Sequence, residues 1–303
     1  MQSTPKLAPG RYVVAVSGGV DSVVLLDLLS RQKSLELVVA HFDHGIRSDS
    51  AKDEELVKSL TEKYRTFHYA MKKSRLGKNV SEEKARQKRY AFLEATRQAT
   101  KSIAIVTAHH QDDLIETALI NLIRGTGWRG LASLRNTATI RRPLLQIPKA
   151  DIRDYAVRHR LKWCEDSTNQ DTRYLRNYIR HQLIPFVSKQ DSSFRPTIVR
   201  LVNEQVELRE AIDGELDSLF VSLASIEANS FSLPRTRLIM MPNAISSELL
   251  YYGISMLTGV GERRPNLYRA LHFIKTARLY KTHQMSGSVA IIVKKGTVVV
   301  YRR

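Results

Sequence analysis

The stretch Ser17-Gly18-Gly19-Val20-Asp21-Ser22 decides the fold that the sequence predicts, because it joins an apolar strand to an apolar helix. The strand is expected over 12–16, and the helix over 21–30, where apolar side chains recur at helical spacing. The two glycines lack the Cβ atoms that would keep the backbone away from an anion, and Ser17 and Ser22 add hydroxyl donors. The first amides of a helix have no acceptor within it, so they point at the same place. The sequence therefore predicts a phosphate-binding turn.

This turn is not a Walker-type phosphate loop, and it contains an aspartate, Asp21, that needs an explanation. The Walker pattern ends in Gly-Lys-Ser or Gly-Lys-Thr, and its lysine is missing here. A carboxylate facing polyphosphate is unfavourable unless a divalent cation lies between them, so Asp21 is a candidate magnesium ligand. The alternatives are a helix cap or an ordinary turn rich in Ser, Gly and Asp. The six residues resemble the pyrophosphate loop (PP-loop) of the ATP pyrophosphatases, enzymes that split ATP between its α and β phosphates and adenylate an oxygen of the acceptor.

Apolar strand patterns and helical patterns alternate through the first half of the chain. Strands are expected at 12–16, 35–40, 67–70, 103–106 and 140–145, and helices at 21–30, 49–65, from 81, at 112–123 and from 148. This alternation predicts the α/β class, a Rossmann-like parallel sheet with right-handed crossovers and helices on both faces. Ligands of such sheets gather at the carboxyl ends of the strands, where Ser17, His41 and Thr107 are expected.

The second half predicts a connector and a small domain. Helices are expected at 174–187, 195–223, 245–257 and 267–277, and a β-hairpin at 289–301 with Gly296 in its turn. The expected domains are a catalytic domain over 1–190, a helical connector over 191–225 and a small α+β domain over 226–303.

The charge of the chain favours a polyanionic partner. The 303 residues include 48 Lys and Arg against 30 Asp and Glu, a formal net charge of +18. Residues 72–101 carry ten basic and three acidic side chains, and residues 262–303 carry ten basic and one acidic. Nucleic acid is the first candidate, and a solvated basic surface is the alternative. No basic stretch has a long apolar face beside it, so membrane binding is not expected.

The cysteine count and the hydropathy of the chain limit the cellular compartments and the cofactors that are compatible with the sequence. The single Cys164 excludes an internal disulfide and a cysteine-built zinc or iron–sulfur site, and a buried structural thiol is expected. No signal peptide and no apolar run of ~20 residues is visible. A cytoplasmic protein is therefore expected, with any metal arriving together with a nucleotide.

Two further polar motifs are expected at the same sheet edge. In 42–47, Asp43 and His44 follow the second strand and can contact a base or ribose, although local bonding within the loop explains them equally well. In 108–117, Asp113 and Glu116 lie three residues apart on one helical face. Two carboxylates on one face indicate a cation, which is either a metal ion or a substrate ammonium group.

Simpler interpretations of these residues remain open. His109 can complete a His-x-x-x-Asp-x-x-Glu metal site with the two carboxylates. Alternatively, Asp112 only caps the helix and Glu116 is exposed to solvent. The segment 124–131 is a cationic, glycine-containing loop that could bind a phosphate or a sugar. Alternatively, its glycine only terminates the preceding helix.

Together these motifs resemble the tRNA(Ile)-lysidine synthetase family. They occur in the family's order over roughly residues 12–186: the PP-loop, Asp43-His44-Gly45, Ala85-Arg86 with Arg89-Tyr90, His109 to Thr117, Arg124 to Leu131, Arg142-Pro143-Leu144-Leu145, and Glu165-Asp166 through Asn177 to Arg180. The resemblance implies that ATP activates the C2 oxygen of the wobble cytidine with release of pyrophosphate. The ε-amine of free lysine then attacks that carbon and expels AMP.

The resemblance also implies roles for particular residues. The ATP site is expected to comprise Ser17, Gly18, Gly19, Val20, Asp21, Ser22, His41, Asp43, His44, Arg86, Arg124 and Gly125, with Mg²⁺ near Asp21. Asp21, His109, Asp113 and Glu116 are the expected catalytic residues, and Asp113 and Glu116 hold the lysine ammonium. Arg89, Arg176, Arg180, Arg263 and Arg264 are expected on tRNA phosphates, with residues 226–303 as a tRNA-binding domain. The implied partners are tRNA(Ile) with a wobble cytidine and free L-lysine, with a homodimer as a candidate assembly.

Other functions fit parts of the pattern. A tRNA thiolase shares the loop but usually needs paired cysteines, and this chain has one. A non-catalytic RNA-binding protein would not need Asp113 and Glu116 beside an intact loop. A GMP- or NAD-synthetase-like enzyme is a further alternative, but it would not explain the net charge of +18.

Overall fold

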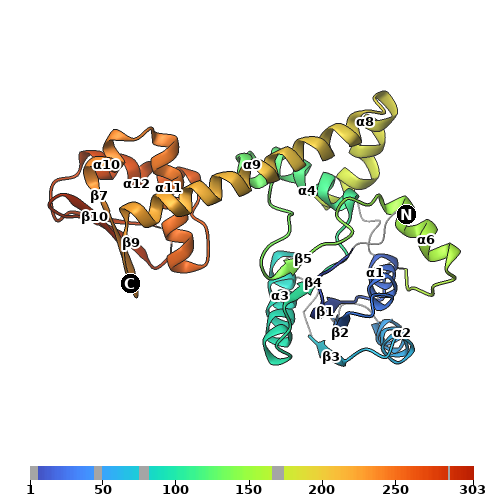
Figure 1. Ribbon diagram of the computed structural model, residues 1–303. Helices are drawn as coiled ribbons and strands as arrows, with labels where there is room; N and C mark the ends of the chain where they lie inside the picture. Colours follow the sequence, from blue (N-terminus) through green and yellow to red (C-terminus); the bar gives the residue numbers. More distant parts are fainter. Residues whose placement is uncertain (1–5, 44–49, 75–81, 166–173, 286) are drawn as a thin grey trace. The chain divides into compact units, whose positions relative to one another are not determined.

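Two compact units make up the chain, Met1–Val206 and Glu207–Arg303. The computed structural model describes residues 6–43, 50–74, 82–165, 174–285 and 287–303 (Figure 1). The helix α9, Phe194–Leu223, passes from the first unit into the second. Within the described residues, no helix is long and apolar enough to cross a membrane.

The first unit is built on a five-stranded sheet in the order β3-β2-β1-β4-β5. Every pairing between neighbouring strands is parallel, which confirms the predicted α/β class. The strands are β1 Gly10–Ala15, β2 Leu35–Asp43, β3 His68–Lys73, β4 Ala104–Val106 and β5 Ile140–Arg141. Because β1 lies in the middle of this order, the turn that follows it has polar segments from β2 and β4 on either side.

Helices cover both faces of this sheet, as predicted. Side chains alternate along β1: Val14 packs in a cluster with residues of α1 and α6, whereas Val13 packs with Leu93 of α3 on the other face. Both valines are fully buried. The helices of this unit are α1 Val20–Ser30, α2 Ser50–Lys63, α3 Glu82–Ala99, α4 Gln111–Ile123, α5 Trp128–Leu131, α6 Lys149–Arg158, α7 Leu175–Tyr178, the π-helix η2 Ile179–Leu183 and α8 Ile184–Gln190.

Two predicted elements of this unit are shortened or divided in the structure, and a proline explains each. The extended run at 140–145 contains a strand of only two residues, since Pro143 has no amide hydrogen to give to a sheet. The single helix expected at 174–187 is three segments with a π-helical turn in the middle. Pro185 cannot donate to the carbonyl of His181, and the backbone widens just before it.

The second unit is a small α+β domain built on an antiparallel sheet in the order β6-β7-β10-β9-β8. Its elements are β6 Ser225–Glu227, β7 Ser230–Pro234, α10 Arg235–Met240, α11 Asn243–Thr258, α12 Arg264–Thr276, β8 Thr282–Gln284, β9 Val289–Val293 and β10 Thr297–Arg302. The predicted hairpin is the β9–β10 pair, and its Gly296 has a φ of +78°. Phe220 and Phe231 are central to the core, and a Cβ on Gly253 would lie 2.5 Å from the Phe231 ring.

Candidate functional site

The turn between β1 and α1 forms a cradle of backbone amides. Gly18 has a φ of +91°, a conformation that side chains with a Cβ rarely adopt. The Ser22 hydroxyl accepts from the amide of Ser17 at 3.2 Å and donates to the carbonyl of Gly19 at 2.8 Å. Gly19 is the N-cap of α1 and supplies no side-chain acceptor. The first amides of α1 therefore face the turn without a side-chain cap, which suits an incoming phosphate.

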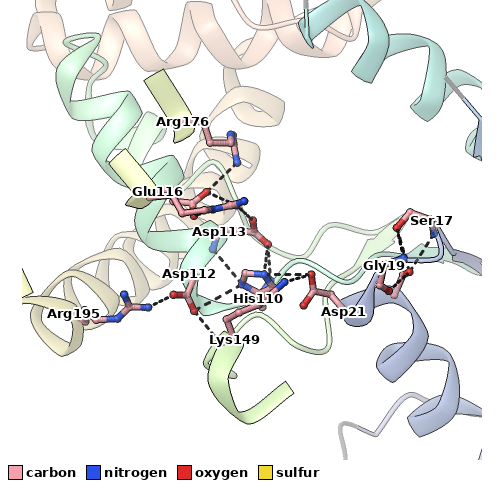
Figure 2. Close-up of polar contacts among 12 residues, drawn as sticks. Ser17, Gly19, Asp21, His110, Asp112, Asp113, Glu116, Lys149, Arg176 and Arg195 are labelled. Carbon is pink, nitrogen blue, oxygen red and sulfur yellow. Dashed lines mark hydrogen bonds and ion pairs between the residues drawn. The ribbon is translucent and has the colours of Figure 1, made fainter. Parts of the chain in front are cut away.

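Asp21 points away from the helix amides and toward other side chains (Figure 2). Its Oδ2 accepts a hydrogen bond from Lys149 Nζ at 2.5 Å and lies 3.7 Å from His110 Nε2. Its Oδ1 is buried and has no hydrogen-bond partner. Asp21 therefore does not cap α1, and one of its oxygens remains for a ligand.

His110 joins the turn to the carboxylates of α4. As the N-cap of α4, its Nδ1 accepts from the amide of Asp113 at 3.4 Å, and Asp113 Oδ2 accepts from the amide of His110 at 3.0 Å. This is the reciprocal arrangement of a capping box. With Nδ1 as an acceptor, Nε2 is the donor nitrogen, 3.5 Å from Asp113 and 3.7 Å from Asp21. His110 thus lies between the PP-loop carboxylate and the first acid of α4.

Glu116 and Asp113 share a guanidinium. Arg180, on η2, donates to Glu116 through Nε at 2.6 Å and Nη2 at 2.9 Å, and it lies 3.6 Å from Asp113. Arg176 lies 3.7 Å from Glu116, whose residue surface is 0% exposed. In this structure the cation beside the two carboxylates is an arginine of the chain itself, whereas the sequence predicts a metal ion or a substrate ammonium group there.

The two acids differ in their proton affinity. Burial raises the pKa of Glu116 above its ordinary value, against the opposing effect of Arg180. Burial also acts to raise the pKa of Asp113, but the electrostatic effects of His110, His109 and Arg180 and the hydrogen bond from the His110 amide outweigh it and hold that pKa below the usual range. Asp113 is thus the more firmly ionised of the pair, which suits it to bind an ammonium group.

His109 is held neutral. Its Nδ1 shares a hydrogen bond of 2.8 Å with Thr107 Oγ1. Burial lowers its pKa to about 3; Asp113 opposes this shift, while Arg142, Arg89 and Arg86 add to it. A neutral imidazole beside Asp113 can accept or donate a hydrogen bond without carrying charge.

The strand β2 reaches further than the sequence indicates. It continues to Asp43, so His41 and Asp43 are buried strand residues and not loop residues. The pairing of Asp43 with Lys73 extends the ladder through these polar positions. His41 Nδ1 donates to the carbonyl of Val16 at 2.8 Å, and its Nε2 is buried without a partner. Asp43 lies 3.6 Å from Lys73, and His44 falls outside the described residues.

Some residues grouped by sequence are apart in the structure. Arg124 and Gly125 follow the last turn of α4, about 16 Å along the helix from Asp113 at 1.5 Å per residue. Arg86 and Arg89 lie on α3, with their guanidinium carbons 5.0 and 5.5 Å from the centroid of the Tyr90 ring. Arg263 and Arg264 belong to the second unit, where both are exposed at the start of α12.

Sequence reasoning missed the roles of three residues. Lys149, the first residue of α6, was not identified because nothing in its local pattern points to Asp21, 128 positions away. Arg142 belongs to the motif Arg142-Pro143-Leu144-Leu145, but the sequence indicated no contact for it. His110 could have been found, since a polar residue three positions before Asp113 fits the spacing of a capping box.

Among the described residues, no group of three or more His, Cys, Asp or Glu is arranged to hold a metal ion. The one free oxygen of Asp21 fits Mg²⁺ in another way. Magnesium keeps several waters and often binds through one or two carboxylates together with substrate phosphates. Asp21 beside the phosphate cradle has this composition.

Comparisons with known proteins show which family and which relatives this chain is similar to. Residues 2–187 match the family model of the PP-loop domain. The chain is 33% identical over 236 residues to a tRNA(Ile)-lysidine synthase of Enterococcus faecalis, covering 75% of this chain and 51% of that protein. It is 38% identical over 205 residues to the protein of the same name from Exiguobacterium sibiricum, covering 65% and 49%. The chain thus spans about half the length of the curated relatives it matches.

A solved structure shares the fold. The U34-tRNA thiolase of Methanococcus maripaludis superposes with a TM-score of 0.56 at 19% identity, covering 67% of this chain and 76% of that one. At this identity the likeness extends to the fold alone.

Proposed function

Because the chain belongs to the PP-loop family, we propose that it is a ligase that uses ATP to join free L-lysine to C2 of the wobble cytidine of tRNA(Ile). The product is lysidine, with release of pyrophosphate and AMP. The names of the relatives support this choice of substrate. One structural observation carries the proposal: His110 lies between Asp21 of the phosphate turn and Asp113 of the acidic pair.

In the first step, the turn 17–22 binds the β and γ phosphates of ATP. Mg²⁺ bound with the nucleotide would be held by the free Oδ1 of Asp21 and would neutralise phosphate charge. Lys149, on the other oxygen, keeps this carboxylate in place. The C2 oxygen of cytidine attacks the α phosphate and pyrophosphate leaves, which turns a poor leaving group into a phosphate monoester.

In the second step, Asp113 and Glu116 hold the ammonium end of lysine near C2. Arg180 has to share or leave this place, since its guanidinium contacts both acids. The firmly ionised Asp113 supplies the charge that binds the amine. The neutral His109 beside it can accept a hydrogen bond from the attacking nitrogen.

The basic residues bind the tRNA. Arg89, Arg176 and Arg180 of the first unit and the exposed Arg263 and Arg264 of the second are the proposed phosphate contacts, with residues 226–303 as a tRNA-binding domain. The charge of +18 supports a polyanionic partner. We propose the cytoplasm as the compartment, because the proposed substrates are found there.

The test is to incubate the protein with ATP, Mg²⁺, radiolabelled lysine and tRNA(Ile) bearing a wobble cytidine. Label should be retained on this tRNA and be absent when the wobble base is changed to uridine. No label on the cytidine tRNA in the presence of ATP would defeat the assignment. Sulfur transfer to the tRNA in its place would support the thiolase, and RNA binding without ATP turnover would support a non-catalytic protein.

A further inference from the structure

Asp112 is an acidic residue of the site that has no part in the proposed reaction. It lies in the first turn of α4, where an aspartate often caps its own helix, but that role belongs to His110. Its two carboxylate oxygens reach two other elements instead. Oδ1 accepts from Arg195 Nη2, in the first turn of α9, and Oδ2 accepts from the amide of Lys149, the first residue of α6, at 2.9 Å (Figure 2). Asp112 therefore joins α4, α6 and α9.

These two bonds keep Asp112 ionised and fixed in orientation. Burial acts to raise its pKa, but the hydrogen bonds from Lys149 and Arg195 and the electrostatic effects of Arg195 and His110 outweigh it and hold that pKa below the ordinary value. A carboxylate that accepts on both oxygens, once from a charged donor, has little freedom to rotate. The side chain thus fixes where α6 begins relative to α4.

The start of α9 is held in place by more than this ion pair. Val202 is 1% exposed and packs in a cluster with Leu114 of α4. One residue later, the side-chain amides of Asn203 and Gln146 exchange hydrogen bonds at 2.9 and 3.3 Å. The first part of α9 is therefore docked by apolar and polar contacts that do not include the ion pair. Substitution of either charged residue should accordingly leave this helix in its place.

The amide held by Asp112 belongs to the residue that contacts the phosphate turn. Lys149 Nζ donates to Asp21 Oδ2 at 2.5 Å, and the other oxygen of Asp21 is the one assigned to Mg²⁺ in the proposed function. The hydrogen-bonded partners of a ligating carboxylate orient it toward the metal. The bonds from Arg195 to Asp112, and from Lys149 to both aspartates, form a continuous line from α9 to the phosphate turn (Figure 2).

We propose that Asp112 and Arg195 are positioning residues for the metal ion. They hold the start of α6, so that Lys149 keeps the free oxygen of Asp21 directed at the cation that arrives with the nucleotide. Neither side chain contacts ATP, lysine or RNA in this role. Because α9 continues into the second unit, the pair also ties the metal ligand to the helix that leads into the proposed tRNA-binding domain. This inference rests on the proposed function for the metal, but not for any step after ATP binds.

Equilibrium binding of ATP tests the role without a chemical step. The affinity is measured with saturating Mg²⁺ and again in EDTA, and the ratio of the two affinities is the contribution of the metal. Asp112→Asn keeps the shape but can accept from only one of its two partners, and Arg195→Gln removes the charge on the other side of the pair. Arg200→Gln, at an exposed position of the same helix, is the matched control.

Both variants of the pair should lower the ratio in the same direction. Loss of a direct partner of a metal ligand costs about 10–100-fold in metal affinity, and this pair acts one step further out, so we expect about fivefold. ATP affinity in EDTA should not change, and Arg200→Gln should leave both affinities unchanged. Arg195→Lys keeps the charge and a donor and should restore the ratio.

The two substitutions remove charges of opposite sign, which separates positioning from a long-range charge effect. Through charge alone, Asp112→Asn would weaken binding of the cation and Arg195→Gln would strengthen it. Changes in opposite directions, or an unchanged ratio in both variants, would overturn the inference. A purely structural role predicts lower melting temperatures with an unchanged ratio, which overturns it as well.

Failure of the proposed function gives a different result. If both variants lower the ratio but the unchanged protein transfers no lysine to tRNA, the lysidine assignment falls and the positioning role stands. If the unchanged protein transfers lysine and the ratio is the same in every variant, only the positioning role falls. An ATP affinity of the unchanged protein that does not depend on Mg²⁺ would overturn both the metal assignment and this inference.

Discussion

Replacing Arg180 with alanine should destabilise the first unit, because it leaves Glu116 as a buried charge. Arg180 gives Glu116 two short, charge-assisted hydrogen bonds of 2.6 and 2.9 Å, and the glutamate has no contact with water. Removing one partner of a buried ion pair costs about 3–5 kcal/mol. Arg176 remains 3.7 Å away and compensates in part, so we expect the lower end, about 3 kcal/mol. For a unit of this size, that corresponds to a melting temperature lower by about 6–12 °C.

The cost should depend on pH, since burial already raises the pKa of Glu116. Loss of Arg180 raises it further, so the carboxyl of the variant takes up a proton more readily. Once neutral, Glu116 no longer carries an uncompensated charge. The deficit in the free energy of unfolding should therefore be smaller at pH 5 than at pH 8.

A double-mutant cycle measures this interaction directly. Glu116→Gln, Arg180→Ala and the double variant are unfolded in urea at both pH values, and we expect a coupling of about 2 kcal/mol at pH 8. Arg153→Ala is the control, because its ion pair with Glu165 is 62% and 74% exposed and should contribute less than about 0.5 kcal/mol. Additive effects of Glu116→Gln and Arg180→Ala would refute the reasoning, as would a deficit that does not change between the two pH values.

Three further predictions follow from the same site. Asp113→Asn should abolish lysine transfer while ATP–pyrophosphate exchange in the presence of tRNA partly survives, and equal loss of both would contradict its role in holding the amine. Burial lowers the pKa of His109 from 6.5 to about 3, so the folded chain binds fewer protons than the unfolded chain between these pH values. The free energy of unfolding should therefore fall as the pH drops below about 6.5. His109→Gln should lose less of this stability between pH 7 and pH 5, as measured by calorimetry. Gly18→Ala forces a Cβ into a φ of +91° and to 3.4 Å from Asp53, and should cost about 1–3 kcal/mol and weaken ATP binding. Gly214→Ala, in the open interior of α9, should cost nothing in denaturation and serves as its control.

The sequence predicted the features that depend on local pattern. The apolar run at 12–16 and the glycines after it predicted β1, the turn and α1, because each depends on residues next to one another. The facing of Asp113 and Glu116 followed from helical spacing. The strand end at Asp43 was not predicted, since polar residues at the end of a strand look like a loop until the neighbouring β3 pairs with them.

Contacts between distant segments account for what the sequence could not predict. Arg180 lies 64 residues from Glu116, and the irregular helix that carries it has no periodic signature. Arg142 is a buried cation, 6% exposed, and a count of basic residues cannot tell such a charge from a solvated one. In the second unit, β6 and β8 have three residues each, too few for an alternating pattern to be seen.

The phosphate turn depends on α6 as much as on its own glycines. At the start of α6, Lys149 bonds Asp21, and six residues later the hydroxyl of Tyr155 donates to the buried Asp27 of α1 at 2.7 Å. Tyr64 donates to the other oxygen of Asp27, also at 2.7 Å. The helix whose amides face the turn is thus fixed along its length by side chains from α6 and from the end of α2. Since Lys149 uses one oxygen of Asp21 and leaves the other free, binding of a cation with the nucleotide does not require this support to be broken.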